Sequence, residues 1–137
     1  FIGIFSISAD TVLANGKDTI DHWEVKRNGK VIIKGSLGTG DMRMNLTRGT
    51  LFEKDMMEIL YFTDIPCVNC QPYIVIQNIN GEELDRIQSL GEGYRFKFKT
   101  KKLQTTSHQN RSGTLMVFFS DGQSGNKLVK LFEVEVK

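Results

Sequence analysis

The only two cysteines of the chain lie in one short stretch, "DIPCVNCQPYIVIQ", as the Cys-x-x-Cys pair Cys67 and Cys70. Such a pair can form a redox centre, half of a zinc site or a disulfide. Redox enzymes place the first thiol at a helix N-terminus, which activates it. Here the pair is followed by Pro72 and an apolar run, Tyr73 to Ile76, that is typical of a strand. The pattern therefore argues against redox catalysis and favours a disulfide that closes a four-residue loop, with two free thiols as the alternative.

A zinc site would need two further ligands beside the cysteines. The chain's only histidines, His22 and His108, complete a Cys₂His₂ set by number. Structural zinc sites normally hold the second pair of ligands close together, whereas these histidines lie far apart in the chain, one in an expected strand and one in a polar loop. A site made of Cys67, Cys70, His22 and His108 is therefore the less favoured reading, and we predict no cofactor.

Side chains with the spacing of a catalytic site are not apparent. The stretch "DTIDH", with Asp18, Asp21 and His22, stands at the start of a strand, where aspartates commonly cap the chain, and no matching nucleophile is identifiable. The loop "SDGQSGN" misses the nucleophile-elbow spacing. Asp121 and Asn126 in that loop could contact calcium, but one carboxylate is a poor start for its oxygen shell. We therefore expect the protein not to be an enzyme.

The basic stretch "YRFKFKTKK" has the composition of a nucleic-acid contact, with both cations and aromatic rings. Its strict alternation places the two kinds of residue on opposite faces of a strand. The aromatic row, Tyr94, Phe96 and Phe98, is expected inside, and the cations are expected in solvent. We therefore expect no nucleic-acid partner.

Alternation of apolar and polar residues runs through most of the chain and is typical of strands. Asn28-Gly29 predicts a two-residue type I′ hairpin turn, and Asn80-Gly81 predicts a second turn of the same type, with Glu83 to Ile87 as the returning strand. We predict an all-β fold, a single-domain antiparallel β-sandwich with an Ig-like strand rhythm and about eight or nine strands. A small β-barrel is the alternative.

One short helix is expected, from Thr50 to about Glu58, because Thr50 and Glu53 match a capping box. The polar stretch from Thr105 to Gly113 is expected to be a loop.

The composition is that of a soluble globular domain, with 39% hydrophobic residues, 25% charged residues and a net charge of +2. We expect residues 1–137 to form one domain. Residues 1–9 are either a signal-peptide remnant or the first strand. No apolar run is long enough to predict a membrane span.

These observations predict a non-enzymatic, exported β-sandwich that acts as a binding or structural accessory module, located in the periplasm, on the cell surface or outside the cell. The partner would be a protein or a polymer, and the protein a monomer or weak oligomer. Loops on a rigid scaffold are the expected contact sites, here Pro66, Cys67, Cys70, Pro72, Asp121 and Asn126. The alternative is a small barrel that carries an apolar ligand, lined by methionines that in a sandwich would fill the core: Met42, Met44, Met56, Met57 and Met116. A hydrolase or metal-binding protein of unrecognised type is the third reading.

Overall fold

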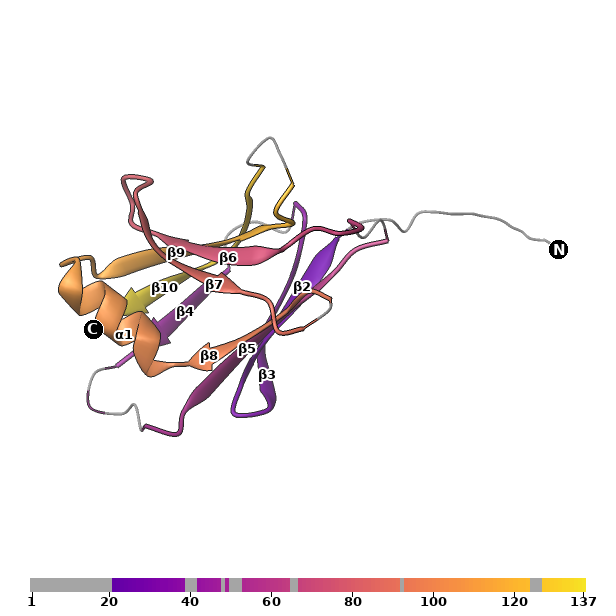
Figure 1. The fold of residues 1–137 in the computed structure, drawn as a ribbon. Helices are drawn as coiled ribbons and strands as arrows, with labels where there is room; N and C mark the ends of the chain where they lie inside the picture. Colours follow the sequence, from indigo (N-terminus) through magenta and orange to yellow (C-terminus); the bar gives the residue numbers. More distant parts are fainter. Residues whose placement is uncertain are drawn as a thin grey trace, which may run out of the picture.

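A computed structural model describes residues 21–38, 42–47, 49, 53–64, 67–91, 93–123 and 127–137. This part of the chain contains nine strands and one helix (Figure 1). The strands are β2 (His22–Arg27), β3 (Lys30–Ser36), β4 (Arg43–Leu46), β5 (Met56–Phe62), β6 (Tyr73–Gln77), β7 (Glu83–Gln88), β8 (Arg95–Lys99), β9 (Thr114–Ser120) and β10 (Val129–Val136). The helix is α1 (Lys101–Gln109). The expectations for residues 1–9 lie outside the described residues.

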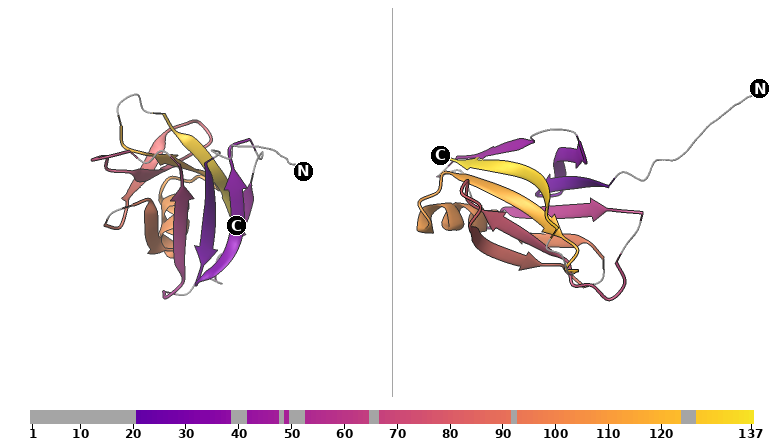
Figure 2. Two further views of the ribbon diagram at one scale, coloured as in Figure 1. Left: turned by 90° about the vertical axis from the view of Figure 1, so that its right-hand side faces the viewer. Right: turned by 90° about the horizontal axis from the view of Figure 1, so that it is seen from above.

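The strands form two sheets that pack face to face (Figure 2). One sheet has the order β4-β10-β9-β6-β7 and the other the order β3-β2-β5-β8. The predicted β-sandwich is confirmed. Its pairs are antiparallel with one exception, because β4 runs parallel to β10, with Met44 opposite Val134. The described strands do not close into a barrel, which was the alternative.

The core lies between the two sheets and follows the alternation of the sequence. In β8, Phe96 and Phe98 are buried, whereas Arg95, Lys97 and Lys99 are exposed, as predicted. Met44 and Met57 are buried in this core, and Met42 packs against it, which is the role expected of methionines in a sandwich. Nearly complete burial is shared by side chains of both sheets: Val25, Ile59, Phe96, Ile74, Val117 and Val134.

The two predicted hairpins are present, but only the first has the predicted turn. Asn28 and Gly29 both have positive φ, 52° and 84°, as a type I′ turn requires. The β6–β7 turn is longer and spans residues 78–82. The Asn78 side-chain oxygen organises it by accepting hydrogen bonds from the N–H groups of Asn80 and Glu82. The local side-chain bonds of Asn78 therefore replace the tight turn.

The predicted helix from Thr50 to Glu58 is wrong where the structure describes it. Glu53 and Lys54 form a turn, and Met56 begins β5. Asp55 is buried and accepts hydrogen bonds from Arg27 on β2, at 3.0 and 2.9 Å, and from the Thr100 hydroxyl at 2.6 Å. These contacts with distant segments decide the conformation, and a capping box is only a local signal.

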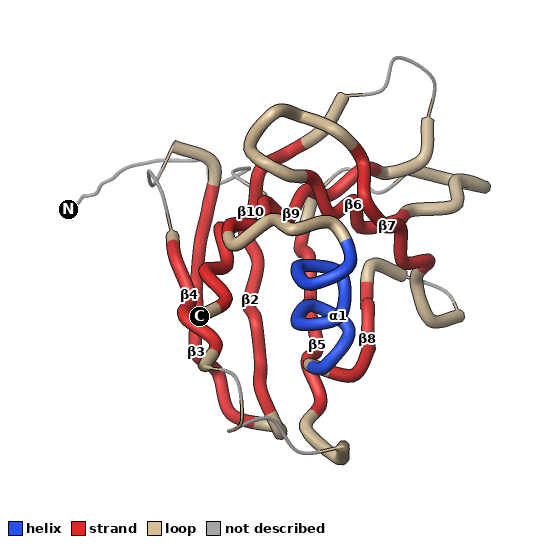
Figure 3. The backbone as a smooth tube through the Cα atoms, turned by 90° about the vertical axis from the view of Figure 1, so that its left-hand side faces the viewer, coloured by secondary structure: helices blue, strands red, loops and turns tan. Residues whose placement is uncertain are grey.

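The single described helix, α1, overlaps the first part of the stretch from Thr105 to Gly113 that was expected to be a loop, whereas residues 110–113 are neither helix nor strand. Leu103 is fully buried in the core, and Thr106 and Ser107 are buried on the same helix. β8 runs antiparallel to β5, with Lys99, at the end of β8, opposite Met56, at the start of β5. The helix α1 follows β8 directly, so it packs at the end of the sandwich where β5 begins, which is the end opposite Phe62 (Figures 1 and 3). None of the described helical residues forms a segment of the length and hydrophobicity that a bilayer crossing requires.

Candidate functional site

Several loops meet at the end of the sandwich opposite α1. β2 begins and β5 ends there, because His22 lies opposite Phe62. β6 begins and β9 ends there, because Tyr73 lies opposite Ser120. We call this region the disulfide end; its described residues are 21–22, 36–38, 62–64, 67–73, 88–91, 93–95 and 120–123. It carries the β5–β6, β7–β8 and β9–β10 connections.

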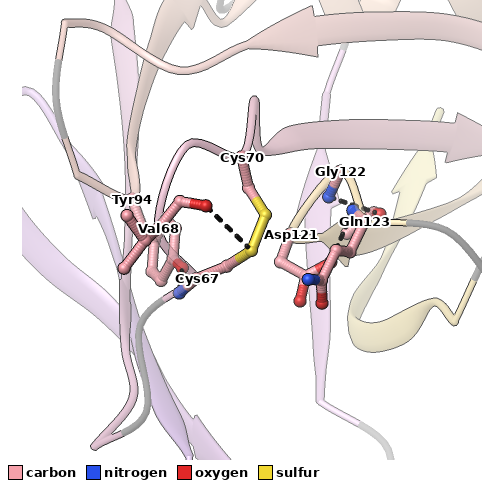
Figure 4. Close-up of a disulfide and its surroundings, with 8 residues drawn as sticks. Cys67, Val68, Cys70, Tyr94, Asp121, Gly122 and Gln123 are labelled. Carbon is pink, nitrogen blue, oxygen red and sulfur yellow. Dashed lines mark hydrogen bonds between the residues drawn. A yellow bond between two sulfur atoms is a disulfide. The ribbon is translucent and has the colours of Figure 1, made fainter.

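The β5–β6 connection contains the disulfide between Cys67 and Cys70, whose Cα atoms are 5.6 Å apart. Asn69, at the tip, has a φ of 63°, which asparagine tolerates better than most residues. Val68 is 82% exposed beside it. Val68 therefore lies exposed inside the short loop that the bridge closes; Figure 4 shows this loop.

The β9–β10 connection packs beside the disulfide loop (Figure 4). Gly122 lies so close to the backbone carbonyl of Gln71 that a Cβ atom at this position would overlap it. The N–H of Gly122 donates to the Ser120 hydroxyl at 3.0 Å, and the N–H of Gln123 donates to the Asp121 carboxylate at 2.8 Å. The two loops are therefore in direct backbone contact and each has its own internal support.

The β7–β8 connection completes the group. The N–H of Ser89 donates to the Pro72 carbonyl at 3.3 Å, and the N–H of Leu90 donates to the Arg95 carbonyl at 2.8 Å. Cys67 donates its backbone N–H to the Tyr94 hydroxyl at 2.7 Å. Hydrogen bonds and close packing therefore link all three connections.

A cluster of aromatic rings lies in the core directly beneath these loops. The rings of Tyr61 and Phe119, from opposite sheets, stack with centroids 3.8 Å apart. Tyr94 and Phe96 meet Phe119 edge-on, at 5.3 and 6.0 Å. The ring of Trp23, on the neighbouring strand, lies nearly parallel to that of Tyr61, with centroids 6.0 Å apart. Such contacts between large rings stabilise the core beyond the burial of their area.

Tyr61 also provides the polar link between the core and the surface. Its hydroxyl donates to the Asp21 carboxylate at 2.7 Å. Burial, with help from this hydrogen bond and from the charges of Asp21 and Asp121, raises the pKa of Tyr61 far above its usual value. The hydroxyl therefore stays protonated and keeps Asp21 in place as an acceptor.

The disulfide end carries most of the exposed large hydrophobic side chains of the described chain. The described chain has seven large hydrophobic side chains that are exposed, and four of them lie here: Leu37, Phe62, Val68 and Leu90. Leu37 is placed by its N–H, which donates to the Asp21 carbonyl at 3.2 Å. Single exposed apolar residues are ordinary, but a group of them at one end of a domain makes that end a candidate interaction site.

The structure brings together some of the residues predicted from the sequence. Cys67, Cys70 and Asp121 all lie at the disulfide end. Pro72 is also there, but it is buried and supports the loops rather than offering a contact. Pro66 and Asn126 lie outside the described residues.

The zinc alternative is not supported by the positions of its four ligands. The two thiols are joined to each other, and His108 lies in α1, at the other end of the sandwich. His22 stacks on Phe62, with ring centroids 4.7 Å apart. Within the described ranges, no three His, Cys, Asp or Glu side chains are grouped so that they could hold a metal ion.

The chain matches no protein-family model, no curated protein and no solved structure. The fold and the disulfide end define an all-β sandwich with one disulfide, and function has to be argued from the surface itself.

Proposed function

We propose that this protein is a binding module that holds a partner protein at its disulfide end and acts by binding rather than by catalysis. The observation that carries the proposal is the gathering of Leu37, Phe62, Val68 and Leu90 on the loops of one end. Burial of apolar surface is the dominant favourable term in most protein association. A partner that covers these side chains would remove this surface from water.

The rigidity of the three connections supports the same proposal. The disulfide, the Tyr94 hydroxyl and the close approach of Gly122 to Gln71 restrict the loops before any partner arrives. A surface that is already ordered loses less conformational entropy on binding, so more of the contact energy appears as affinity. A protein partner fits better than a flexible polar polymer, because the exposed groups are aliphatic and aromatic.

Location outside the cytoplasm is part of this proposal. The Cys67–Cys70 bridge is compatible with an oxidising compartment, where disulfides persist. We also infer an immunoglobulin-like arrangement, supported by two packed sheets and by the clustering of connections from both sheets at one end.

The test is retention of proteins from the source organism on the immobilised chain. Val68→Asp and Leu90→Asp should each abolish retention of the specific partner. Ile79→Asp is the matched control, because Ile79 is 69% exposed but lies on the β6–β7 turn, away from the disulfide end. Loss of the same protein from the Ile79 variant, or its retention by both disulfide-end variants, would contradict the proposal.

A further inference from the structure

The apolar side chains of the disulfide end are accompanied by carboxylates without a cation. Asp21, Asp64 and Asp121 form no ion pair with any described residue. Asp21 accepts the Tyr61 hydroxyl, and Asp121 accepts the N–H of Gln123. Both are hydrogen bonds from neutral groups, so neither donor supplies a positive charge to the carboxylate.

These three acids lie close to the exposed apolar groups. Asp64 is exposed and follows Phe62 by two positions. Asp21 accepts the Tyr61 hydroxyl at the start of β2, and Asp121 directly follows β9 at the same end of the sandwich. Asp121 stands beside the disulfide loop that presents Val68 (Figure 4).

Elsewhere in the described chain most acids are paired with cations. Ion pairs are formed by Asp55 with Arg27, Glu53 with Lys99 and Lys101, Glu58 with Arg95, Glu83 with Arg86, Asp85 with Lys102, Glu133 with Arg43 and Lys130, and Glu135 with Arg43 and Lys137. Two acids away from the disulfide end are also without an ion pair. Of these, Glu24 lies opposite Lys34 in the β2–β3 register, and Glu82 accepts a hydrogen bond from Asn78. The β6–β7 turn also has one such carboxylate, Glu82, and one exposed apolar side chain, Ile79. The disulfide end differs from the rest of the described surface because it has three such carboxylates and four exposed apolar side chains.

The cations near this end do not offset the three carboxylates. Arg95 directs its guanidinium to Glu58. Lys127 lies in the β9–β10 connection, shortly before β10, and supplies one positive charge. Among the described residues, carboxylates therefore outnumber unpaired cations around Phe62 and Val68.

On the basis of the proposed function, we propose that the partner presents an apolar patch with Lys or Arg side chains at its rim, which pair with Asp21, Asp64 and Asp121. A partner that covered these carboxylates without supplying cations would strip them of water without compensation, which is costly. Complementary charges at a rim also steer the encounter and fix the orientation of the two proteins. The negative charge thus selects among the many proteins that could offer an apolar patch.

A display library of random linear peptides, selected on the immobilised full chain, tests the inference without requiring the partner itself. Enriched peptides should combine Leu, Ile or Phe with Lys or Arg and carry net positive charge. Their affinity should fall about two- to fivefold in each of Asp21→Asn, Asp64→Asn and Asp121→Asn, as expected for exposed charge pairs. Asparagine still accepts the native hydrogen bonds, so these variants should fold. Glu82→Gln is the matched control and should bind the peptides unchanged.

The outcomes separate the two proposals. Neutral or acidic peptides that still depend on Val68 would overturn the charge inference and leave the disulfide end as the binding surface. A selection that yields no peptide sensitive to Val68→Asp would overturn both. Cationic peptides whose affinity falls with the three aspartate variants, and falls further with rising salt, support both.

Discussion

The Tyr94 hydroxyl accepts a hydrogen bond from the backbone N–H of Cys67 at 2.7 Å. Tyr94 stands immediately before β8, and its ring meets Tyr61 and Phe119 edge-on. One side chain therefore connects the disulfide loop to the aromatic cluster in the core. The loop that presents Val68 is held by this contact as well as by its covalent bridge.

Tyr94→Phe should free the disulfide loop without disturbing the core. The substitution keeps the ring but removes the acceptor, and a hydrogen bond of this kind contributes about 1 kcal/mol. Hydrogen exchange should show faster exchange at the Cys67 amide. The amide of Ile74, in the middle of β6, serves as the internal control and should be unchanged; equal acceleration at both sites would mean that the whole sheet had loosened.

Removal of the disulfide should cost modest stability. For a closed loop of four residues, the chain-entropy model gives about 2 kcal/mol, less than for longer loops. Urea unfolding of Cys67→Ser/Cys70→Ser, followed by the fluorescence of Trp23, measures the difference from the oxidised protein. The intact mass of the denatured wild-type protein should rise by two hydrogen atoms on reduction, and an unchanged mass would show that the thiols were free from the start.

Gly122→Ala should destabilise the protein more than Gly38→Ala. Both glycines have positive φ, 83° and 86°, so both variants carry the backbone cost of alanine in that region, roughly 1–2 kcal/mol. Only at Gly122 does the new Cβ atom also meet the Gln71 backbone, whereas nothing lies within 4 Å at Gly38. Thermal unfolding of the two variants under one condition gives the comparison. An equal loss of stability in both would show that Gly122 and the backbone of Gln71 are not in close contact.

Asp55 should make stability depend on pH in the acid range. Hydrogen bonding from Arg27, and to a lesser extent from Thr100, holds the pKa of Asp55 below its usual value despite its burial. A lowered folded-state pKa stabilises the protein above the unfolded-state pKa of about 3.9, and this contribution is lost as the pH falls through the folded-state pKa.

Asp55→Asn removes this contribution and leaves Arg27 without its carboxylate, so it should cost about 2 kcal/mol or more at neutral pH. Urea unfolding between neutral pH and pH 2 should show the wild-type and variant curves converging as the pH falls below about 4. A constant difference across this range would mean that Asp55 does not titrate in the folded protein.

The sheets were predictable because their signals are local. In β8 the strict alternation around Phe96 and Phe98 determines which face is buried, and Asn28-Gly29 determines the first turn. The position of the helix was predicted wrongly because it depends on contacts between distant segments. The Thr100 hydroxyl, at the start of α1, bonds to Asp55 instead of capping the helix, and Leu103 anchors the helix through tertiary packing. Glu53, which suggested a capping box, instead pairs with Lys99 and Lys101.

The candidate site was only partly predictable. The cysteine spacing and the glycine-rich loop indicated Cys67, Cys70 and Asp121. Phe62 belongs to a nearly continuous apolar run, so the sequence does not show which of its side chains are exposed. The β2–β5 register places Tyr61 inward and therefore Phe62 outward. Leu37 and Leu90 stand in connections whose meeting depends on the arrangement of both sheets.

The most direct test of the central claim is the footprint of a partner captured from the source organism, mapped by hydrogen exchange on the full chain. We expect slower exchange at amides of residues 67–70, 89–91 and 121–123, with no change in α1 or at the β6–β7 turn. Protection confined to α1, or to the outer face of either sheet, would contradict the assignment of binding to the disulfide end.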